Sequence, residues 1–127
     1  MPSNISVEYA ILCDMVRRED SGKLIIIGVY DADIQTTAFP LKLEVSLLVR
    51  FSGVPAEEVK FEIGAYLDET RMMHGSADIT FSDPGSVFVP FPRIPLDVTH
   101  EGTIRFDLKI GDADWKTVWK APVSLRK

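Results

Sequence analysis

The stretch Leu41–Phe51, LKLEVSLLVRF, places an apolar side chain at every odd-numbered position. Polar or charged residues occupy most of the even-numbered positions, as Lys42 and Glu44 do. A period of two puts the odd-numbered side chains on one face of a β-strand, whereas a helix needs apolar residues three and four positions apart. The stretch therefore predicts a strand with one face in a hydrophobic core.

The same alternation recurs near residues 5–15, 59–67 and 104–110, and we expect these segments to be strands too. Glycine and proline favour chain reversals, so we expect turns at Ser21–Gly22, Ser52–Gly53, His74–Gly75, Asp83–Gly85, Glu101–Gly102 and Gly111–Asp112. About eight strands follow, near residues 5–16, 23–31, 41–52, 58–68, 75–82, 86–98, 103–110 and 115–125. This spacing predicts an all-β fold, a two-sheet antiparallel sandwich that is immunoglobulin-like or C2-like.

Length and charge limit the classes of function. A chain of 127 residues is most simply one domain spanning residues 1–127. The formal net charge is -5, and the basic pair Arg17–Arg18 is followed directly by Glu19 and Asp20. Because Lys and Arg supply most non-specific affinity for phosphates, we expect neither a nucleic acid nor an anionic membrane as partner.

Cysteine content and the N-terminal segment suggest a location. Cys13 is the single cysteine, so no intramolecular disulfide can form, as is usual in a reducing compartment. The first ten residues, MPSNISVEYA, lack the features of a signal peptide, and no apolar run approaches the length of a membrane helix. We therefore expect a cytoplasmic protein.

Two apolar runs joined by charged residues form the segment Ala10–Asp31. We expect Arg17–Lys23 to be the exposed connection of a hairpin. The run Leu24–Ile27 does not alternate, which is typical of a strand covered on both faces. The cover is either the loop Ile34–Pro40, which we favour, or a second subunit, and we also expect weak self-association into a homodimer.

The segment Val87–Val98 contains Pro90, Pro92 and Pro95, none of which can donate a hydrogen bond to a neighbouring strand. We therefore expect an edge strand or a crossing between the sheets, in which the prolines prevent unwanted strand addition.

No catalytic or metal-binding motif stands out. The chain has no nucleophile elbow, no zinc-protease motif and no phosphate-binding glycine loop. Cys13 lies in an apolar strand, where a thiol behaves as a small hydrophobe. One cysteine and two distant histidines cannot form a standard zinc site. We therefore expect no enzyme activity, no cofactor and no metal.

Asp14 is a carboxylate among the apolar residues Ala10, Leu12 and Val16 of the same strand face. Such a group needs a partner. Arg17, Arg18 and Lys23 are the nearest cations in the sequence, so Asp14 forms either a structural salt bridge at the base of the hairpin or a ligand-binding carboxylate. The candidate binding residues are Asp14, Arg17, Tyr30 and Asp31.

The N-terminal third also resembles a known family. YAILCDMVRREDSGKLIIIGVYD, followed by Phe39–Pro40, is similar to small uncharacterised bacterial proteins that share the pattern Ala-x-Leu-Cys-Asp-x-Val-Arg, then Gly-Lys, Gly-x-Phe/Tyr-Asp and Phe-Pro. The matching residues are Ala10, Leu12, Cys13, Asp14, Val16, Arg17, Gly22, Lys23, Gly28, Tyr30, Asp31, Phe39 and Pro40. Tyr30 stands where phenylalanine is more usual. The resemblance implies a bacterial cytosolic domain with no assigned activity.

A non-enzymatic binding or assembly module with a protein partner is the function that these features favour. One alternative is a calcium- or lipid-binding C2-like sandwich, supported by the loop carboxylate pairs Asp31 with Asp33, Asp68 with Glu69, and Asp112 with Asp114. Another is an enzyme with a site near Asp14, Arg17 and Asp31.

Overall fold

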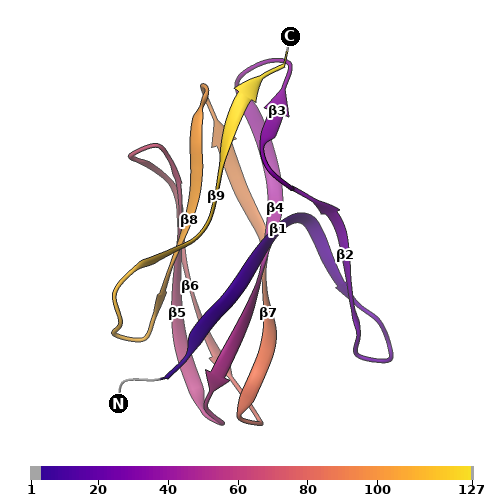
Figure 1. Cartoon of the computed structure of the whole chain (residues 1–127), viewed down its shortest axis with the longest axis vertical. Helices are drawn as coiled ribbons and strands as arrows, with labels where there is room; N and C mark the ends of the chain where they lie inside the picture. The colour runs from indigo at the N-terminus through magenta and orange to yellow at the C-terminus, as the bar shows by residue number, and fades with distance from the viewer. Residues whose placement is uncertain (1–3, 127) are drawn as a thin grey trace.

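A computed structural model describes residues 4–126, and its regular structure consists of β-strands (Figure 1). The strands are β1 (Ser6–Arg18), β2 (Leu24–Val29), β3 (Ile34–Thr36), β4 (Leu41–Val54), β5 (Glu58–Leu67), β6 (Thr70–Thr80), β7 (Gly85–Val98), β8 (Gly102–Ile110) and β9 (Lys116–Leu125). One sheet has the order β2-β1-β4-β7, and the other has the order β3-β9-β8-β5-β6. The prediction of an all-β two-sheet sandwich is confirmed. The finer assignment, immunoglobulin-like or C2-like, stays a prediction.

The core lies between the sheets and is built from the alternating faces. Val45, Leu47, Val49 and Phe51 of β4 are each 0% exposed, as their spacing predicts. They meet side chains of the other sheet, and the ring centroids of Phe51 and Phe61 lie 5.1 Å apart. Burial of such a side chain contributes roughly 1.5–3 kcal/mol to stability, which makes this face of β4 a major source of stability.

The alternation of β1 changes phase along the strand, contrary to the prediction of one continuous face. A β-bulge between Val7 and Tyr9 shifts the register against β4. Val7 packs against the core before the bulge, and Ala10 and Leu12 do so after it. Tyr9, which is 48% exposed, and Cys13, which is buried, lie outside the core cluster.

Two turn predictions are wrong, and one strand was not predicted. His74–Gly75 lies inside β6, because Asp68, with a positive φ of 53°, and Glu69 form the connection between β5 and β6. Gly53 forms an irregularity near the end of β4 rather than a turn. The three-residue β3 pairs with β9 in parallel, although the other strand pairs are antiparallel. Its length is too short for alternation to be recognised.

The second half of β1 leaves the sandwich together with β2. β1 pairs with β4 only as far as Cys13, opposite Ser46, and from there it pairs with β2 alone. This part of the hairpin, residues 14–29, is called the arm below, and it projects from the two sheets in Figure 1. Its tip is a turn in which the Glu19 amide donates to the Lys23 carbonyl at 2.8 Å. The prediction of an exposed connection is confirmed for residues 19–23, whereas Arg17 and Arg18 are exposed strand residues that pair with Ile25 and Leu24.

The arm is covered on one face only, so the prediction of cover on both faces of Leu24–Ile27 is wrong. Leu24 and Ile26 are half-buried, whereas Ile25 is 41% exposed and Ile27 is 43% exposed. The favoured cover, the loop Ile34–Pro40, is used elsewhere. Its Ile34 is buried in the core, and its Phe39 packs against the same core.

β7 forms the outer edge of the four-stranded sheet opposite β2. Its prolines at 90, 92 and 95 lie in that edge strand, so the prediction from the proline pattern is confirmed.

Candidate functional site

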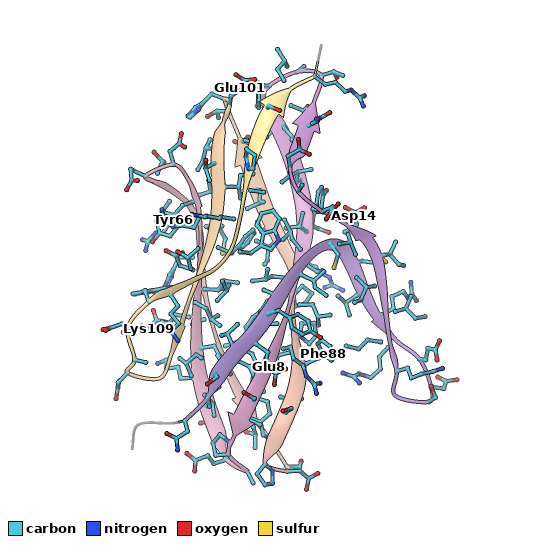
Figure 2. All side chains as sticks on the ribbon, viewed as in Figure 1. Glu8, Asp14, Tyr66, Phe88, Glu101 and Lys109 are labelled. Atoms are coloured by element: carbon cyan, nitrogen blue, oxygen red, sulfur yellow. The ribbon has the colours of Figure 1, made fainter. Side chains whose placement is uncertain are left out.

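Asp14, Gly28 and Tyr30 meet where the arm leaves the sandwich; Asp14 is labelled at this bend in Figure 2. The Tyr30 hydroxyl donates a hydrogen bond to Oδ1 of Asp14 at 3.0 Å. Gly28 lies opposite Asp14 in the hairpin, with a φ of 71°. A Cβ at Gly28 would overlap the carboxylate, since it would lie only 2.7 Å from Cγ of Asp14. The carboxylate therefore fills the space that a side chain at position 28 would need.

The predicted partner of Asp14 is wrong. Among the described residues its carboxylate forms no ion pair with Arg17, Arg18 or Lys23. Its partner is the hydroxyl of Tyr30, a residue that packs against the core.

Tyr30 is a hydrogen-bond donor at neutral pH. Burial raises the pKa of its hydroxyl to about 12, and the hydrogen bond to Asp14 and the negative charge of Asp14 act in the same direction. The phenol therefore remains protonated and serves to hold the Asp14 carboxylate in place.

The four predicted binding residues do not form one cluster. Asp14 and Tyr30 are in contact, and Arg17 lines the same hollow as Asp14. Asp31 is exposed after the end of β2, and within residues 4–126 its side chain makes no hydrogen bond or ion pair.

Two adjoining hollows separate the arm from the outer face of β4 and β7, and together they are called the arm groove. One has a volume of about 530 Å³ and is lined by Arg18, Gly22, Lys23, Leu24, Ile26, Leu48, Arg50, Ser86, Val87 and Phe88. The other has a volume of about 680 Å³ and is lined by Asp14, Met15, Val16, Arg17, Arg18, Glu44, Ser46, Pro92 and Arg93. Arg18 borders both hollows, so it marks their junction.

Basic side chains concentrate along this groove although the protein is acidic. Five of the 14 Lys and Arg residues line it, namely Arg17, Arg18, Lys23, Arg50 and Arg93. Only two of the 19 acidic residues do, Asp14 and Glu44. The groove is therefore a local cationic surface on a chain of net charge -5.

Arg50 forms the floor of the first hollow together with Phe88. The guanidinium carbon of Arg50 lies 4.7 Å from the Phe88 ring centroid, and its Nε lies 3.8 Å from Oε1 of Glu8. Figure 2 shows Glu8 and Phe88 close together beside β7. Sequence reasoning missed Arg50 because its partners come from β1 and β7, which are distant in the sequence.

Arg93 stands at the far end of the groove in a strained conformation. Its φ is 58°, in the left-handed region that favours glycine. It lies where the register between β4 and β7 shifts, between the pairs of Val45 and Leu47. Bulges of this kind redirect side chains, but nothing in the sequence predicts a positive φ at an arginine.

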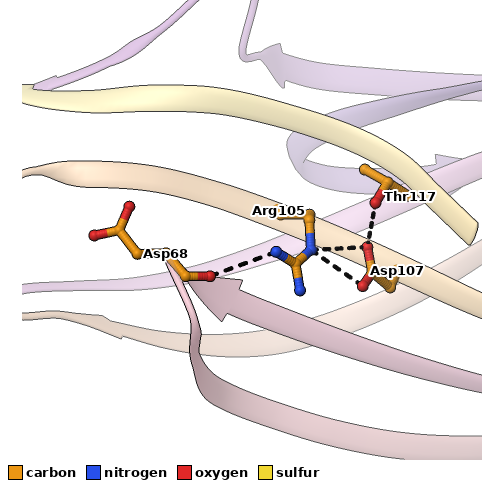
Figure 3. Close-up of polar contacts among 4 residues, drawn as sticks. All are labelled: Asp68, Arg105, Asp107 and Thr117. Carbon is orange, nitrogen blue, oxygen red and sulfur yellow. Dashed lines mark hydrogen bonds and ion pairs between the residues drawn. The ribbon is translucent and has the colours of Figure 1, made fainter.

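A second polar cluster lies on the five-stranded sheet (Figure 3). Asp107 is only 9% exposed and accepts bonds at 3.1 Å from Nε of Arg105 to both of its oxygens. The Thr117 hydroxyl donates to Oδ1 of Asp107 at 2.7 Å, and Nη1 of Arg105 donates to the Asp68 carbonyl at 3.5 Å. The Asp107 carboxylate is satisfied by its neighbours, which is typical of a structural network.

His74 and Glu62 form a further acid–base pair, on the five-stranded sheet. Nε2 of His74 lies 3.1 Å from Oε1 of Glu62, and Nζ of Lys109 lies 3.8 Å from Oε2 of Glu62. The Trp115 ring, 40% exposed, lies 6.2 Å from the His74 ring. Neither hollow of the arm groove includes this pair.

The loop carboxylates do not converge in the part of the chain that the structure describes. Residues 4–126 contain no group of three or more His, Cys, Asp or Glu side chains that could hold a metal ion. Asp68 accepts the Thr103 amide at 3.0 Å, and Asp33 accepts from the Gln35 side chain at 3.1 Å. No helix in residues 4–126 is long and apolar enough to cross a membrane.

Comparison with known proteins identifies a family without assigning an activity. A search of curated proteins gives no significant match. A family model matches residues 8–118, which span the arm, the groove and most of both sheets. The chain belongs to DUF6941, a family of unknown function.

Proposed function

We propose that the protein is a non-enzymatic assembly module that recognises a protein partner by strand addition along β2. β2 is the edge of its sheet, and its sequence LIIIGV contains no charge and no proline. A long apolar edge without these protective features is a template for pairing with another strand. The opposite edge, β7, carries three prolines. The contrast between the two edges is the observation that carries the proposal.

Exposed apolar side chains on the arm support the proposal that a partner binds at this surface. Met15, Ile25, Ile27 and Val29 are 43%, 41%, 43% and 56% exposed. The hairpin register pairs Met15 with Ile27 and Cys13 with Val29, so these side chains share one face of the arm. Apolar patches of this kind mark interaction sites, because covering them removes apolar area from water.

The proposed partner is a second copy of the chain. Two β2 edges related by a two-fold axis would pair antiparallel and join the two four-stranded sheets, and two-fold dimers are the commonest soluble assemblies. We propose a weak homodimer, because the arm is narrow and the patch is small. The chain's single buried cysteine and its family resemblance support a bacterial cytoplasm as the place of action.

Sedimentation equilibrium from about 1 to about 100 μM tests this proposal. We expect a reversible dimer that dissociates at least tenfold more readily in the double variant Ile25→Thr, Ile27→Thr. The matched control is Leu125→Thr, because Leu125 is 42% exposed on β9 of the other sheet. A strict monomer, or a dimer that the arm variant leaves intact while circular dichroism shows the fold preserved, would refute it.

The two alternatives have weaker support. A calcium- or lipid-binding site needs converging carboxylates, and Asp68 and Asp33 are each engaged by a neighbouring group. An enzyme site near Asp14 needs a free carboxylate beside a nucleophile, whereas Asp14 is bonded to the raised-pKa hydroxyl of Tyr30.

A further inference from the structure

We propose that the arm groove binds an extended acidic peptide segment. On β2 the groove is lined by Leu24 and Ile26, whereas Ile25 and Ile27 form the assembly surface. Met15 of β1 belongs to both surfaces. The groove therefore goes beyond the assembly surface described above. Its first hollow combines the apolar side chains of Leu24, Ile26, Leu48 and Phe88 with the cationic groups of Arg18 and Lys23. A ligand that matches this lining carries carboxylates beside apolar side chains.

The cations of the groove have capacity for new carboxylates. Among residues 4–126, no carboxylate lies within ion-pair distance of Arg17, Arg18 or Arg93. Arg18 donates from Nη1 to the Gly22 carbonyl at 2.8 Å, which leaves most of its five donors for another acceptor. Since Arg18 borders both hollows, it is placed to form a two-point contact with a carboxylate at their junction.

The backbone conformation of Arg93 is an independent observation in favour of a binding site in the groove. Glycine would adopt a φ of 58° without strain, yet this position carries a long cationic side chain that lines the groove. Backbone strain of this kind concentrates at sites where a side chain is needed in a particular direction. The register irregularity between β4 and β7 therefore places a cation in the lining of the groove.

A peptide explains the shape and charge better than a nucleic acid does. The two hollows share Arg18 in their linings, and each has the volume of a ligand site. The chain as a whole carries a net charge of -5, which opposes a long polyphosphate that extends beyond the groove. A short acidic segment contacts only the local cationic surface.

Fluorescence anisotropy with a short, capped, labelled peptide that alternates glutamate and leucine tests the proposal. The control peptide alternates lysine and leucine. We expect the glutamate peptide to bind with a Kd below about 1 mM, and we expect the affinity to fall as salt is raised from about 0.05 to about 0.5 M. We expect no binding of the lysine peptide.

The decisive variant is Arg93→Gly, because it removes the cation and relieves the strained backbone. We expect at least tenfold weaker peptide binding together with an unchanged or higher Tm. Arg18→Ala should weaken binding to a similar extent, whereas Arg71→Ala, at an exposed arginine on β6 of the other sheet, should have no effect.

Four outcomes overturn the proposal. They are no binding up to about 1 mM, equal binding of both peptides, wild-type affinity in both groove variants, and groove-dependent binding of a single-stranded oligonucleotide in place of the peptide. The assembly variant Ile25→Thr, Ile27→Thr should keep peptide binding, so failure of one proposal can be distinguished from failure of the other.

Discussion

Replacing Gly28 with alanine should destabilise the protein through Asp14. The new Cβ would overlap the Asp14 carboxylate, with Cγ only 2.7 Å away. The aspartate side chain can escape by rotating, but it then loses the hydrogen bond from Tyr30. The substitution should therefore combine a backbone penalty at position 28 with the loss of a distant hydrogen bond.

The two contributions can be estimated separately. A residue with a Cβ at a φ of 71° costs about 1–2 kcal/mol relative to glycine. A hydrogen bond to a charged group contributes about 1.5 kcal/mol, at the low end because Asp14 is exposed. Gly28→Ala should thus lower the free energy of unfolding by about 3 kcal/mol, and Asp14→Ala should lower it by about 1.5 kcal/mol.

A double-mutant cycle, measured by urea unfolding, checks the mechanism. Once alanine replaces Gly28, the bond to Tyr30 is already lost, so adding Asp14→Ala should cost almost nothing more. The control is Gly111→Ala, because Gly111 has a φ of 56° and open space where its Cβ would lie. It should show the backbone penalty alone. Additive losses of about 4.5 kcal/mol in the double variant would refute the argument.

Two further predictions follow from Tyr30 and Cys13. Because the folded state raises the pKa of Tyr30 from 10.0 to about 12, its protonated form stabilises the fold fully below pH 10. That stability, discounted to about 1 kcal/mol for a partly exposed group, should be lost as pH rises from about 10 through about 12. Urea unfolding across this range measures it, and a flat profile would contradict it. Burial, and secondarily the charge of Asp14, raises the pKa of the Cys13 thiol, so dithionitrobenzoate should react far more slowly with native than with urea-unfolded protein. Equal rates would show that the thiol is accessible.

Alternation in the sequence was sufficient to predict the sandwich, because a period of two reports directly on which side chains are buried. It was sufficient for the middle of β4, where Val45, Leu47, Val49 and Phe51 are buried as the spacing predicts. The even-numbered Ser46 and Leu48 are buried as well, which the spacing does not predict. It failed in β1, where the bulge after Val7 reverses the phase without any glycine or proline to signal it. Alternation also failed to predict the arm. A strand that projects beyond its sheet can have the same composition as a strand that remains paired within the sheet.

The sequence identified part of the candidate site. Asp14 stands out as a charge among apolar residues, but the sequence does not indicate Tyr30 as its partner, because a neutral hydroxyl 16 positions away gives no charge pattern. The arm groove could not be predicted, because Arg50 and Arg93 reach it from β4 and β7 only when the sheet is assembled. A positive φ at Arg93 has no sequence signature of the kind that glycine gives.

The contact between Asp14 and Gly28 favours one register of the arm, and both proposed surfaces depend on that register. In the arm, Ile25 and Ile27 face outward, and Leu24 and Ile26 line the groove. A slip of one residue in the hairpin register would exchange these two sets, because successive side chains point to opposite faces. Such a slip would also place Ile27 or Val29 opposite Asp14, where a side chain would force the carboxylate to rotate and lose the hydrogen bond from Tyr30.

Only the observed register of the arm thus places a glycine opposite Asp14. The hydrogen bond from Tyr30 holds the carboxylate over that glycine, and packing of Tyr30 against the core fixes the donor. We infer that Gly28 and Tyr30, which contact Asp14 but line neither hollow, act on binding indirectly, by setting which side chains form the edge surface and which line the groove. The variant Tyr30→Phe should then weaken assembly and peptide binding together, whereas Arg93→Gly should weaken only peptide binding.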